Sequence, residues 1–188
     1  MTQHMKKIGY MGIPLSNSEN AAKIFLGKHG MEAEPVPLVT SEGVVKALMD
    51  GTVDYGVVAT RNIVAGPVTE TEEAMKLGSF CKIDEIGVPI HHCVFVKKEG
   101  VAVNTVASHI QALGQTKANL DILFPGAKRV AVEDTALAAE MLADGRLSEN
   151  TAVICGMSAG IHNGLTLFKS NVEDDKENLT YFALIEYR

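Results

Sequence analysis

The stretch that decides the fold is NLTYFALI, residues 178–185. Its Tyr, Phe, Leu and Ile residues predict a β-strand, which follows the acidic turn VEDDKE at residues 172–177. Thr180 stands where the turn becomes the strand, and a loop at the mouth of a sheet is where a rigid scaffold presents chemistry. Strand propensity alone also explains a threonine here, so this stretch leaves both a structural and a functional role open for Thr180.

The composition is that of a soluble globular protein, with 188 residues, of which 46% are hydrophobic and 21% charged. The net charge of -6 and the absence of a basic run argue against nucleic acid as a partner. No apolar run approaches the roughly 20 residues of a membrane helix, and no signal peptide is apparent. The odd number of cysteines, without CxxC spacing, predicts reduced, buried thiols at Cys81, Cys93 and Cys155 in a cytoplasmic protein.

The first part of the chain alternates strands and helices. Strands are predicted at residues 8–12, 34–39 and 55–59, with helices after residue 16, over 41–49 and after 68. This order predicts a parallel sheet with ligands at the carboxyl ends of its strands, where the loops 12–18 and 60–68 lie. Ser16 and Ser18 suit a helix start that binds an anion such as a carboxylate, although plain capping explains them equally.

A long extended segment, residues 83–96, is predicted to cross into a second lobe. Its neighbouring His91 and His92 point to opposite faces of a strand and cannot jointly hold a metal. Beyond it, a helix capped by Ser108 is predicted, and strands at 128–132 and 152–155 flank a helix that Asp134 and Thr135 open. After a short helix that follows residues 156–158, the chain returns to the first lobe and its last strand joins the first sheet.

The predicted fold class is therefore α/β, with two lobes around a cleft. Lobe 1 is expected at about residues 1–83 plus 171–188, and lobe 2 at about 84–170. A cleft lined by Ser, Thr and Asn suits a small polar or anionic molecule. The sequence shows no dinucleotide fingerprint, P-loop, serine-nucleophile elbow or metal-spaced cluster, so neither a cofactor nor a metal is predicted.

Six short motifs follow one another along the chain. They are GIPLSNSENAA at 12–22, DYGVVATRNIVAGPV at 54–68, PIHHC at 89–93, SHIQALGQ at 108–115, DTALAA at 134–139 and NLTYF at 178–182. In this order and spacing the chain resembles, over nearly its whole length, the catalytic domain of the prephenate dehydratase family. The corresponding family motifs are GPxGTFSxxAA, DYGVVPIENSxxGxV, IHHC, SHPQALAQ, STAxAA and NxTRF.

The resemblance implies a fold like that of type II periplasmic-binding proteins and a homodimer or homotetramer. It implies a lyase of L-phenylalanine biosynthesis that converts prephenate to phenylpyruvate without a cofactor, because aromatisation drives the loss of carbon dioxide and the ring hydroxyl. The motif threonine, here Thr180, would donate a proton or hydrogen bond to that hydroxyl, an effect typically worth ~10²–10⁴-fold. Many family members carry a regulatory domain after the last strand; the sequence ends at Arg188, so no phenylalanine feedback is predicted within this chain.

Several motif positions are retained and others are replaced. The hydroxyl and amide residues that survive are Ser16, Ser18, Asn62, Thr135 and Thr180. The departures are Leu15 for glycine, Asn17 for phenylalanine, Arg61 for glutamate, Ile63 for serine, Asp134 for serine and Tyr181 for arginine.

Three of these departures change the charge of the expected site. A phenol cannot replace the bidentate grip of a guanidinium on a carboxylate, so one hypothesis is that Arg61 supplies the cation that Tyr181 no longer does; the alternative is a solvated Arg61. Asp134 suits a helix cap but would repel an anion, which argues for an altered ligand or an altered rim. The predicted site therefore comprises Thr180 as catalytic residue and, for a small anionic substrate, Ser16, Ser18, Arg61, Asn62, Asp134, Thr135 and Tyr181.

Three functions are compatible with this pattern. The first is a prephenate dehydratase-like lyase, favoured by the motifs. The second is a related enzyme on a cyclohexadienyl acid, such as a decarboxylase that does not aromatise the ring. The third is a non-catalytic protein that binds a small carboxylate or amino acid; replaced motif residues favour the third, and retention of Thr180 favours the first two.

Overall fold

The computed structural model describes residues 5–188, and these residues form two compact units. Unit 1 holds the described residues up to Pro89 together with Leu179–Arg188, and unit 2 holds Ile90–Asn178. The chain crosses between the units twice, so unit 2 is one continuous segment and unit 1 is assembled from two.

The crossings lie several residues beyond the positions expected near 83 and 171. Strand β5 (Phe80–Pro89) stays paired with β11 (Leu179–Tyr187) along its length, from Tyr187↔Phe80 to Leu179↔Pro89. Immediately afterwards the amide of Ile90 donates to the carbonyl of Asn178 over 2.9 Å. The two crossing segments thus leave the sheet of unit 1 together, and that sheet keeps residues 84–89.

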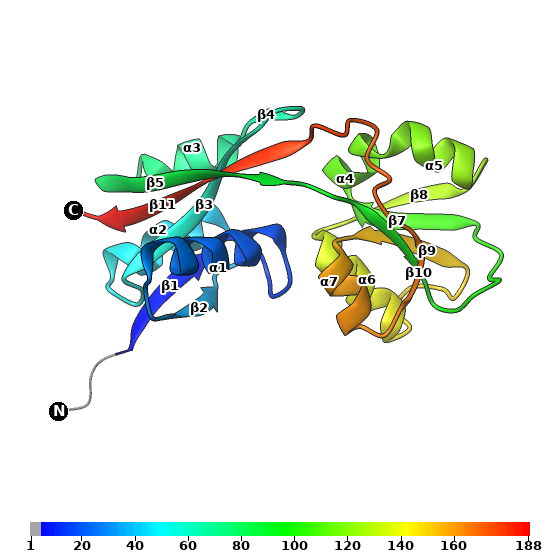
Figure 1. Ribbon diagram of the computed structural model, residues 1–188, viewed down its shortest axis with the longest axis horizontal. Coiled ribbons are helices and arrows are strands. Elements are labelled where there is room, and N and C mark those ends of the chain that lie inside the picture. The colour runs from blue at the N-terminus through cyan, green and yellow to red at the C-terminus, as the bar shows by residue number, and fades with distance from the viewer. Residues whose placement is uncertain (1–4) are drawn as a thin grey trace. The chain divides into compact units, whose positions relative to one another are not determined.

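Unit 1 is built on a six-stranded sheet with the order β2-β1-β3-β11-β5 (Figure 1). The remaining strands are β1 (Lys6–Tyr10), β2 (Ala33–Pro37), β3 (Tyr55–Asn62) and the short β4 (Gly66–Pro67), which pairs with β3. β1 is parallel to β2 and β3, whereas β11 is antiparallel to both β3 and β5. The predicted parallel sheet is confirmed for the first three strands, and the last strand joins it as predicted.

The antiparallel pairing of β11 decides where its first residues lie. Because β11 runs against β3, its beginning lies at the carboxyl end of β3, and Thr180 is paired with Asn62 and Tyr181 with Arg61. Residues 60–62, expected as loop, are therefore strand. The carboxyl edge of the parallel strands, where ligands bind in such sheets, receives a strand from the other end of the sequence.

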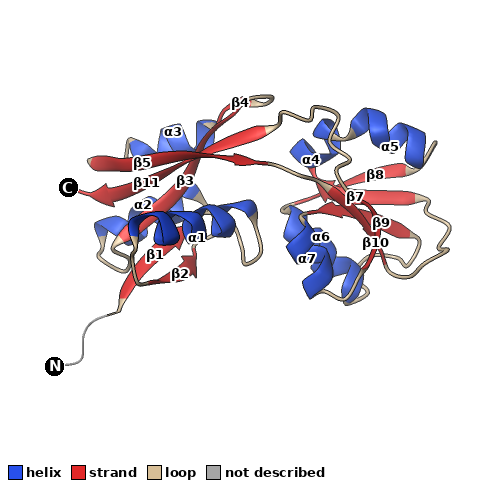
Figure 2. Cartoon of the chain, in the orientation of Figure 1, coloured by secondary structure: helices blue, strands red, loops and turns tan. Residues whose placement is uncertain are grey.

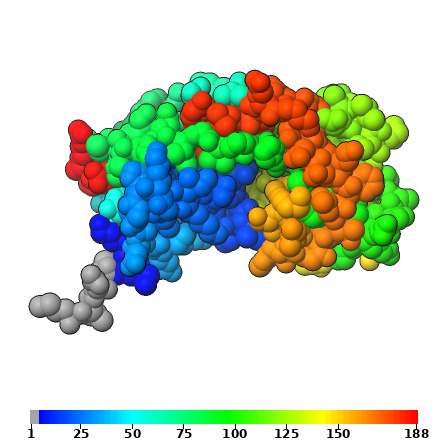
Figure 3. All heavy atoms as spheres, viewed as in Figure 1, coloured from blue at the N-terminus to red at the C-terminus, as the bar shows by residue number. Residues whose placement is uncertain are grey.

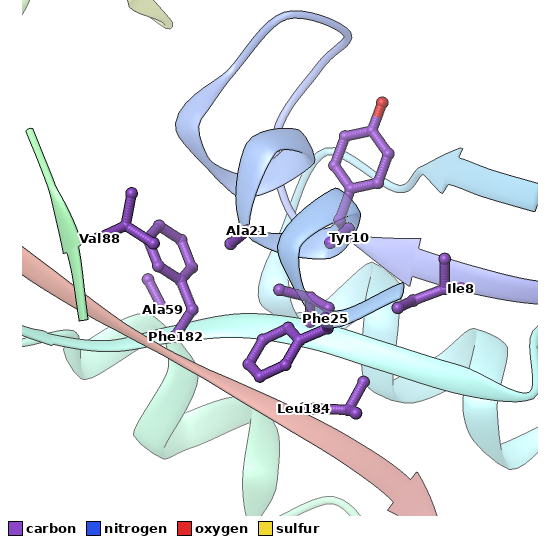
Figure 4. Packing of buried hydrophobic residues seen from close by; sticks show 10 residues of the cluster. Ile8, Tyr10, Ala21, Phe25, Ala59, Val88, Phe182 and Leu184 are labelled. Carbon is purple, nitrogen blue, oxygen red and sulfur yellow. The ribbon is translucent and has the colours of Figure 1, made fainter. Parts of the chain in front are cut away.

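Helices cover both faces of this sheet (Figure 2). They are α1 (Asn17–His29), α2 (Ser41–Met49) and α3 (Thr69–Met75). Phe182 and Val88 pack with Phe25 of α1 in one core cluster (Figure 4), whereas Ala183 packs with Val44 of α2 in another. Neighbouring residues of β11 thus point to opposite faces, as strand geometry requires.

On the α1 face, an ion-pair cluster joins α1 to β5. Asp84 of β5 lies 2.7 Å from the Lys28 ammonium and 2.8 Å from the Nε2 of His29. These hydrogen bonds, first that of Lys28 and then that of His29, lower the pKa of Asp84 to about 2. The surfaces of the two elements adjoin in Figure 3, α1 in blue and β5 in green.

Unit 2 is built on a five-stranded sheet with the order β10-β6-β9-β7-β8. Its strands are β6 (Cys93–Val96), β7 (Thr105–His109), β8 (Lys128–Val132), β9 (Thr151–Cys155) and β10 (Thr166–Lys169). Its helices are α4 (Ile110–Gln115), α5 (Lys117–Leu123), α6 (Thr135–Ala143) and α7 (Met157–His162). β7 is parallel to β8 and β9, so the carboxyl ends of these three strands share one edge.

The prediction that Ser108 caps a helix is wrong. Ser108 is a buried residue of β7, and its hydroxyl donates to the carbonyl of Ile154 over 2.6 Å. His109 caps α4 instead, with its ring nitrogen accepting from the amide of Gln111. The apolar residues Val106 and Ala107 are paired between β8 and β9, and this pairing extends the strand by the residues read as helix.

The cysteines are free, as predicted, but not uniformly buried. Cys93 and Cys155 are buried and face each other across β6 and β9, whereas Cys81 on the edge strand β5 is partly exposed. Burial raises the pKa of Cys155 to about 12, and the neighbouring Cys93 adds to the rise. Within residues 5–188, no helix is long and apolar enough to cross a membrane.

Candidate active site

The centre of the candidate site is the pair formed by Thr180 and Asn62. The side-chain amide nitrogen of Asn62 donates to the hydroxyl oxygen of Thr180 over 2.8 Å. Both residues are half-buried and lie where β3 ends and β11 begins. The structure thus joins two candidate residues that are 118 positions apart in the sequence.

The direction of this hydrogen bond is fixed by the loop that follows β3. The backbone amides of Val64 and Ala65 both donate to the side-chain oxygen of Asn62, each over 2.9 Å. A backbone amide can only donate, so this side-chain atom is the carbonyl oxygen and the nitrogen must face Thr180. The Thr180 hydroxyl therefore accepts from Asn62, and its own hydrogen is left to point at another acceptor.

Arg61 and Tyr181 form a second pair on the same two strands. They are directly opposed, and the guanidinium carbon of Arg61 lies 3.7 Å from the centre of the Tyr181 ring. Among the residues that the structure describes, no carboxylate forms an ion pair with Arg61. The contact is a cation–π interaction, which in exposed positions contributes about 0.5–1 kcal/mol.

The two pairs lie on opposite faces of the sheet. Thr180 is paired with Val88, which packs in the core cluster of α1 together with Phe182. Tyr181 instead lies over Gly87 on the other face, since a Cβ at Gly87 would be 3.4 Å from the Tyr181 ring. The structure therefore brings Thr180 and Asn62 to the α1 side and leaves Arg61 and Tyr181 on the side of α2 and α3.

Ser16 and Ser18 lie in the loop and first turn of α1, at the end of β1. Ser16 caps α1, accepting from the amide of Glu19 over 3.3 Å. A Cβ at Gly12 would lie 3.0 Å from the Ser16 hydroxyl and 3.8 Å from that of Ser18, so both hydroxyls face the backbone of Gly12. They border the carboxyl end of β1, which neighbours β3, and belong to the same face as Thr180.

Leu15, where the family motif has glycine, adopts a conformation that suits glycine. Its φ is 70°, in the left-handed region, which costs a residue with a Cβ roughly 1–2 kcal/mol. The carboxylate of Glu19 accepts from the Leu15 amide over 2.5 Å and also pairs with Lys23. The loop thus keeps its glycine-like path although the residue has changed.

The other candidate residues, Asp134 and Thr135, belong to unit 2. As predicted, Asp134 caps α6, and one of its oxygens accepts from the amides of Ala136 over 2.6 Å and Leu137 over 3.3 Å. Thr135 begins the helix and is half-buried. Both follow β8, at the carboxyl edge of the parallel strands of unit 2.

The rings of His91 and His92 contact different residues. The ring of His91 contacts Glu173 over 3.0 Å, whereas the buried ring of His92 contacts the side-chain oxygen of Gln115 over 2.8 Å. Burial lowers the pKa of His92, which favours the neutral ring. Within residues 5–188 no three His, Cys, Asp or Glu side chains are grouped so as to hold a metal ion.

Sequence reasoning missed the polar network around Glu173. This carboxylate is 1% exposed; burial raises its pKa, but hydrogen bonds from the His92 amide and the His91 ring outweigh that effect and hold the pKa below its usual range. Gln115 accepts from His92 and, over 2.9 Å, from Asn178, two residues before Thr180. Glu173 lies in a run that was predicted only to be an acidic turn. Gln115 and Asn178 lie inside two of the six motifs, and this was the only signal in the sequence that could have identified them.

Comparison with known sequences points to one family. A family model described as prephenate dehydratase matches residues 8–188. Arogenate dehydratase 5, chloroplastic, of Arabidopsis thaliana is 30% identical over 182 residues, which cover 95% of this chain and 41% of that protein. The bifunctional chorismate mutase/prephenate dehydratase of Stutzerimonas stutzeri is 28% identical, with 95% and 48% covered. The chain thus spans less than half the length of these relatives.

Solved structures share the fold. A prephenate dehydratase from Arthrobacter aurescens in complex with L-Phe superposes with a TM-score of 0.84 at 21% identity, covering 97% of this chain and 60% of that one. GqqA, a quorum quenching acylase, gives 0.79 at 23%, covering 97% and 64%. A putative methionine-binding lipoprotein from Bacillus subtilis gives 0.52 at 15%, covering 98% and 83%. The predicted α/β fold, like that of periplasmic-binding proteins, is confirmed.

Proposed function

Since this chain belongs to the prephenate dehydratase family, we propose that it is a carbon–oxygen lyase acting on a cyclohexadienyl acid. Its substrate is prephenate or the corresponding amino acid, arogenate, and the product is the aromatic phenylpyruvate or phenylalanine. Both reactions lose carbon dioxide and the ring hydroxyl. This activity belongs to L-phenylalanine biosynthesis.

The observation that supports the proposal is the fixed direction of the Asn62–Thr180 hydrogen bond. With its amide oxygen held by the amides of Val64 and Ala65, Asn62 offers only N–H to Thr180. The Thr180 hydroxyl is therefore arranged as a donor. A leaving hydroxyl needs such a donor. A bound carboxylate would accept from the same hydroxyl, so the donor favours the lyase together with membership of a family of lyases.

The proposed chemistry needs one proton at the departing oxygen. The bond between the ring and its carboxylate breaks, carbon dioxide leaves, and the electron pair enters the ring. The carbon–oxygen bond to the ring hydroxyl then breaks, and the oxygen leaves as water with the hydrogen that Thr180 donates; solvent restores that hydrogen. Aromatisation supplies the driving force, and no step calls for electron transfer. A positioned donor of this kind contributes ~10²–10⁴-fold to the rate.

The remaining candidate residues on the Thr180 face are proposed to bind the substrate. The hydroxyls of Ser16 and Ser18 and the first turn of α1 suit a carboxylate, because the unpaired amides at a helix start favour an anion. The binding roles of Asp134 and Thr135, which belong to unit 2, stay predictions. No such role is assigned to Arg61 or Tyr181, which lie on the opposite face of the sheet from Thr180.

The test is turnover of prephenate and arogenate by the purified protein at neutral pH, with the aromatic product followed directly. Thr180→Ala should lower kcat by ~10²-fold or more. Thr105→Ala is the matched control, because Thr105 is also a partly exposed strand threonine whose hydroxyl bonds to an asparagine side chain, Asn104; it should leave kcat unchanged.

Other outcomes identify the alternative functions. Consumption of prephenate without an aromatic product would indicate a decarboxylase that does not aromatise the ring. No consumption of either compound would contradict the lyase and favour a protein that only binds a small carboxylate or amino acid. The homodimer or homotetramer and the cytoplasmic location stay predictions, and light scattering would test the first.

A further inference from the structure

Tyr10, the last residue of β1, is a buried tyrosine whose hydroxyl is not used by the protein. Only 1% of its surface is exposed, and it packs in the core cluster of α1. Among the hydrogen bonds of residues 5–188, none involves this hydroxyl, whereas that of the partly exposed Tyr55 accepts from Lys6 over 2.9 Å. No fully buried side-chain oxygen or nitrogen of these residues lacks a hydrogen bond, so the small exposed area of Tyr10 includes its hydroxyl.

The hydroxyl of Tyr10 leaves the core cluster beside the first turn of α1. In Figure 4 it points away from the side chains of Ile8, Phe25 and Leu184. Burial, and then the nearby carboxylate of Glu19 in the first turn of α1, raise the pKa of Tyr10 to about 12. The phenol is therefore neutral at any working pH and keeps its hydrogen.

Glu19 does not accept the hydrogen of Tyr10, because both of its oxygens have other partners. One oxygen accepts from the Leu15 amide over 2.5 Å, and the other lies 3.0 Å from the Lys23 ammonium. The ammonium of Lys23 also offsets the negative charge of Glu19. The hydrogen of Tyr10 is thus available to a molecule bound at the start of α1.

The start of α1 offers more donors of the same kind. The hydroxyls of Ser16 and Ser18 face Gly12, two residues after Tyr10. Ser16 accepts from the Glu19 amide, and this bond leaves the hydrogen of its hydroxyl free to donate. The first amides of a helix have no partner within it, and such amides favour an anion. Hydroxyl donors from β1 and α1 therefore border one anion-binding helix start.

We propose that Tyr10 is a further substrate-binding residue, whose hydroxyl donates a hydrogen bond to the substrate carboxylate held at the start of α1. This inference rests on the proposed function and adds a third side chain to Ser16 and Ser18. Tyr10 shares its core cluster with Phe182 and Val88 of the Thr180 face, and all of these residues belong to unit 1. A hydrogen bond to an ionised acceptor is about twice as strong as one between neutral groups, so a carboxylate is the preferred acceptor.

Tyr10→Phe tests this inference, because it removes the hydroxyl and keeps the buried ring. KM for prephenate and for arogenate should rise about ten- to hundredfold, as for loss of a hydrogen bond to a charged group, while kcat changes less than about threefold. The melting temperature without substrate should equal that of wild type or exceed it, because no hydrogen bond within the protein is lost. Tyr55→Phe is the matched control in unit 1: it removes the hydroxyl that Lys6 contacts and should leave KM and kcat unchanged.

Turnover with an unchanged KM in Tyr10→Phe would overturn the inference and leave the lyase intact. A lower melting temperature with an unchanged KM would show that the hydroxyl has a structural role. A fall in kcat alone would also overturn the inference, since the hydroxyl would then act only in the transition state.

Binding without turnover separates the two proposals. In the Thr180→Ala background prephenate should raise the melting temperature, and adding Tyr10→Phe should increase the prephenate concentration needed for the same rise about tenfold or more. Binding that depends on Tyr10, without turnover in the wild type, would refute the lyase and keep Tyr10 as a carboxylate-binding residue.

Discussion

The two faces of the β3–β11 strand pair differ in whether they retain the residues of the family motifs. On the α1 face, Asn62 and Thr180 retain the family's motif residues and are hydrogen-bonded to each other. On the other face, the motif's glutamate and arginine have both been replaced, and the replacements, Arg61 and Tyr181, are again in direct contact. The changes lie at paired positions, so they form one altered contact and not two scattered losses.

The difference teaches that a contiguous motif can serve two purposes. Threonine and the next residue of the NxTRF motif point to opposite faces, because strand side chains alternate. One face presents chemistry, and the other joins β3 to β11 through a pair of large side chains. The hypothesis that Arg61 supplies the substrate's cation requires its guanidinium on the Thr180 face, whereas the pairing places it on the opposite one.

The largest effect on activity is expected from reversing the Asn62–Thr180 hydrogen bond, because this would remove the proposed donor from the Thr180 face. In Asn62→Asp the carboxylate can still accept from Val64 and Ala65 but can no longer donate, so the Thr180 hydroxyl would donate to it and lose its role as donor to the substrate. We expect kcat to fall by ~10²–10³-fold with little change in KM or melting temperature. Activity within threefold of wild type would show that the direction of this bond does not matter.

On the Thr180 face, a substitution in the loop of Leu15 should change the free energy of unfolding. Leu15→Gly relieves the left-handed strain and should raise the free energy of unfolding by about 0.5–1 kcal/mol, after the entropic cost of glycine. Urea denaturation measures the change. Leu77→Gly is the control: its backbone is not in the left-handed region and its side chain is 48% exposed, so it should be destabilising. Destabilisation by both changes would mean that contacts of the Leu15 side chain outweigh the strain.

On the opposite face, Arg61→Met should lower the free energy of unfolding only slightly. The aliphatic side chain still covers the Tyr181 ring, and only the cation–π term of about 0.5–1 kcal/mol is lost from the free energy of unfolding. KM for either substrate should change less than about threefold, since Arg61 is not on the Thr180 face. A tenfold rise in KM would instead support Arg61 as the cation that binds the substrate. Both faces of the strand pair would then contribute to the site.

The smallest effect is expected from the ion pairs between α1 and β5. Hydrogen bonds from Lys28 and His29 lower the pKa of Asp84 from 3.8 to about 2. Their contribution to stability is therefore complete above the unfolded-state pKa and is lost as the pH falls through about 2. Asp84→Asn should lower the melting temperature slightly at pH 6, and the difference should vanish in strong acid. A difference in melting temperature that does not depend on pH would contradict the conclusion that ionised Asp84 stabilises the protein through Lys28 and His29.

Much of this architecture followed from local patterns. Alternating apolar runs and helix starts predicted the order of elements in unit 1, and the carboxyl-edge rule predicted that loop 12–18 and the end of the third strand lie at the same edge of the sheet. What local patterns could not give depends on pairing between distant segments. The face of Arg61 is set by its register with Tyr181. Ser108 was predicted to cap a helix, but it belongs to β7, which is paired with β8 and β9. Glu173 was predicted only to lie in an acidic turn, and its burial could not be predicted because its histidine partners lie over 80 residues away.

The place of β11 between β3 and β5 has a consequence for synthesis on the ribosome. Unit 2 is continuous and can fold as soon as residue 178 has left the exit tunnel. Unit 1 cannot, because β5 has no partner in its sheet until Leu179–Tyr187 arrives. The first half of the chain must therefore wait with an open strand edge, and the residue that completes the proposed chemistry is delivered by the same segment that completes the sheet.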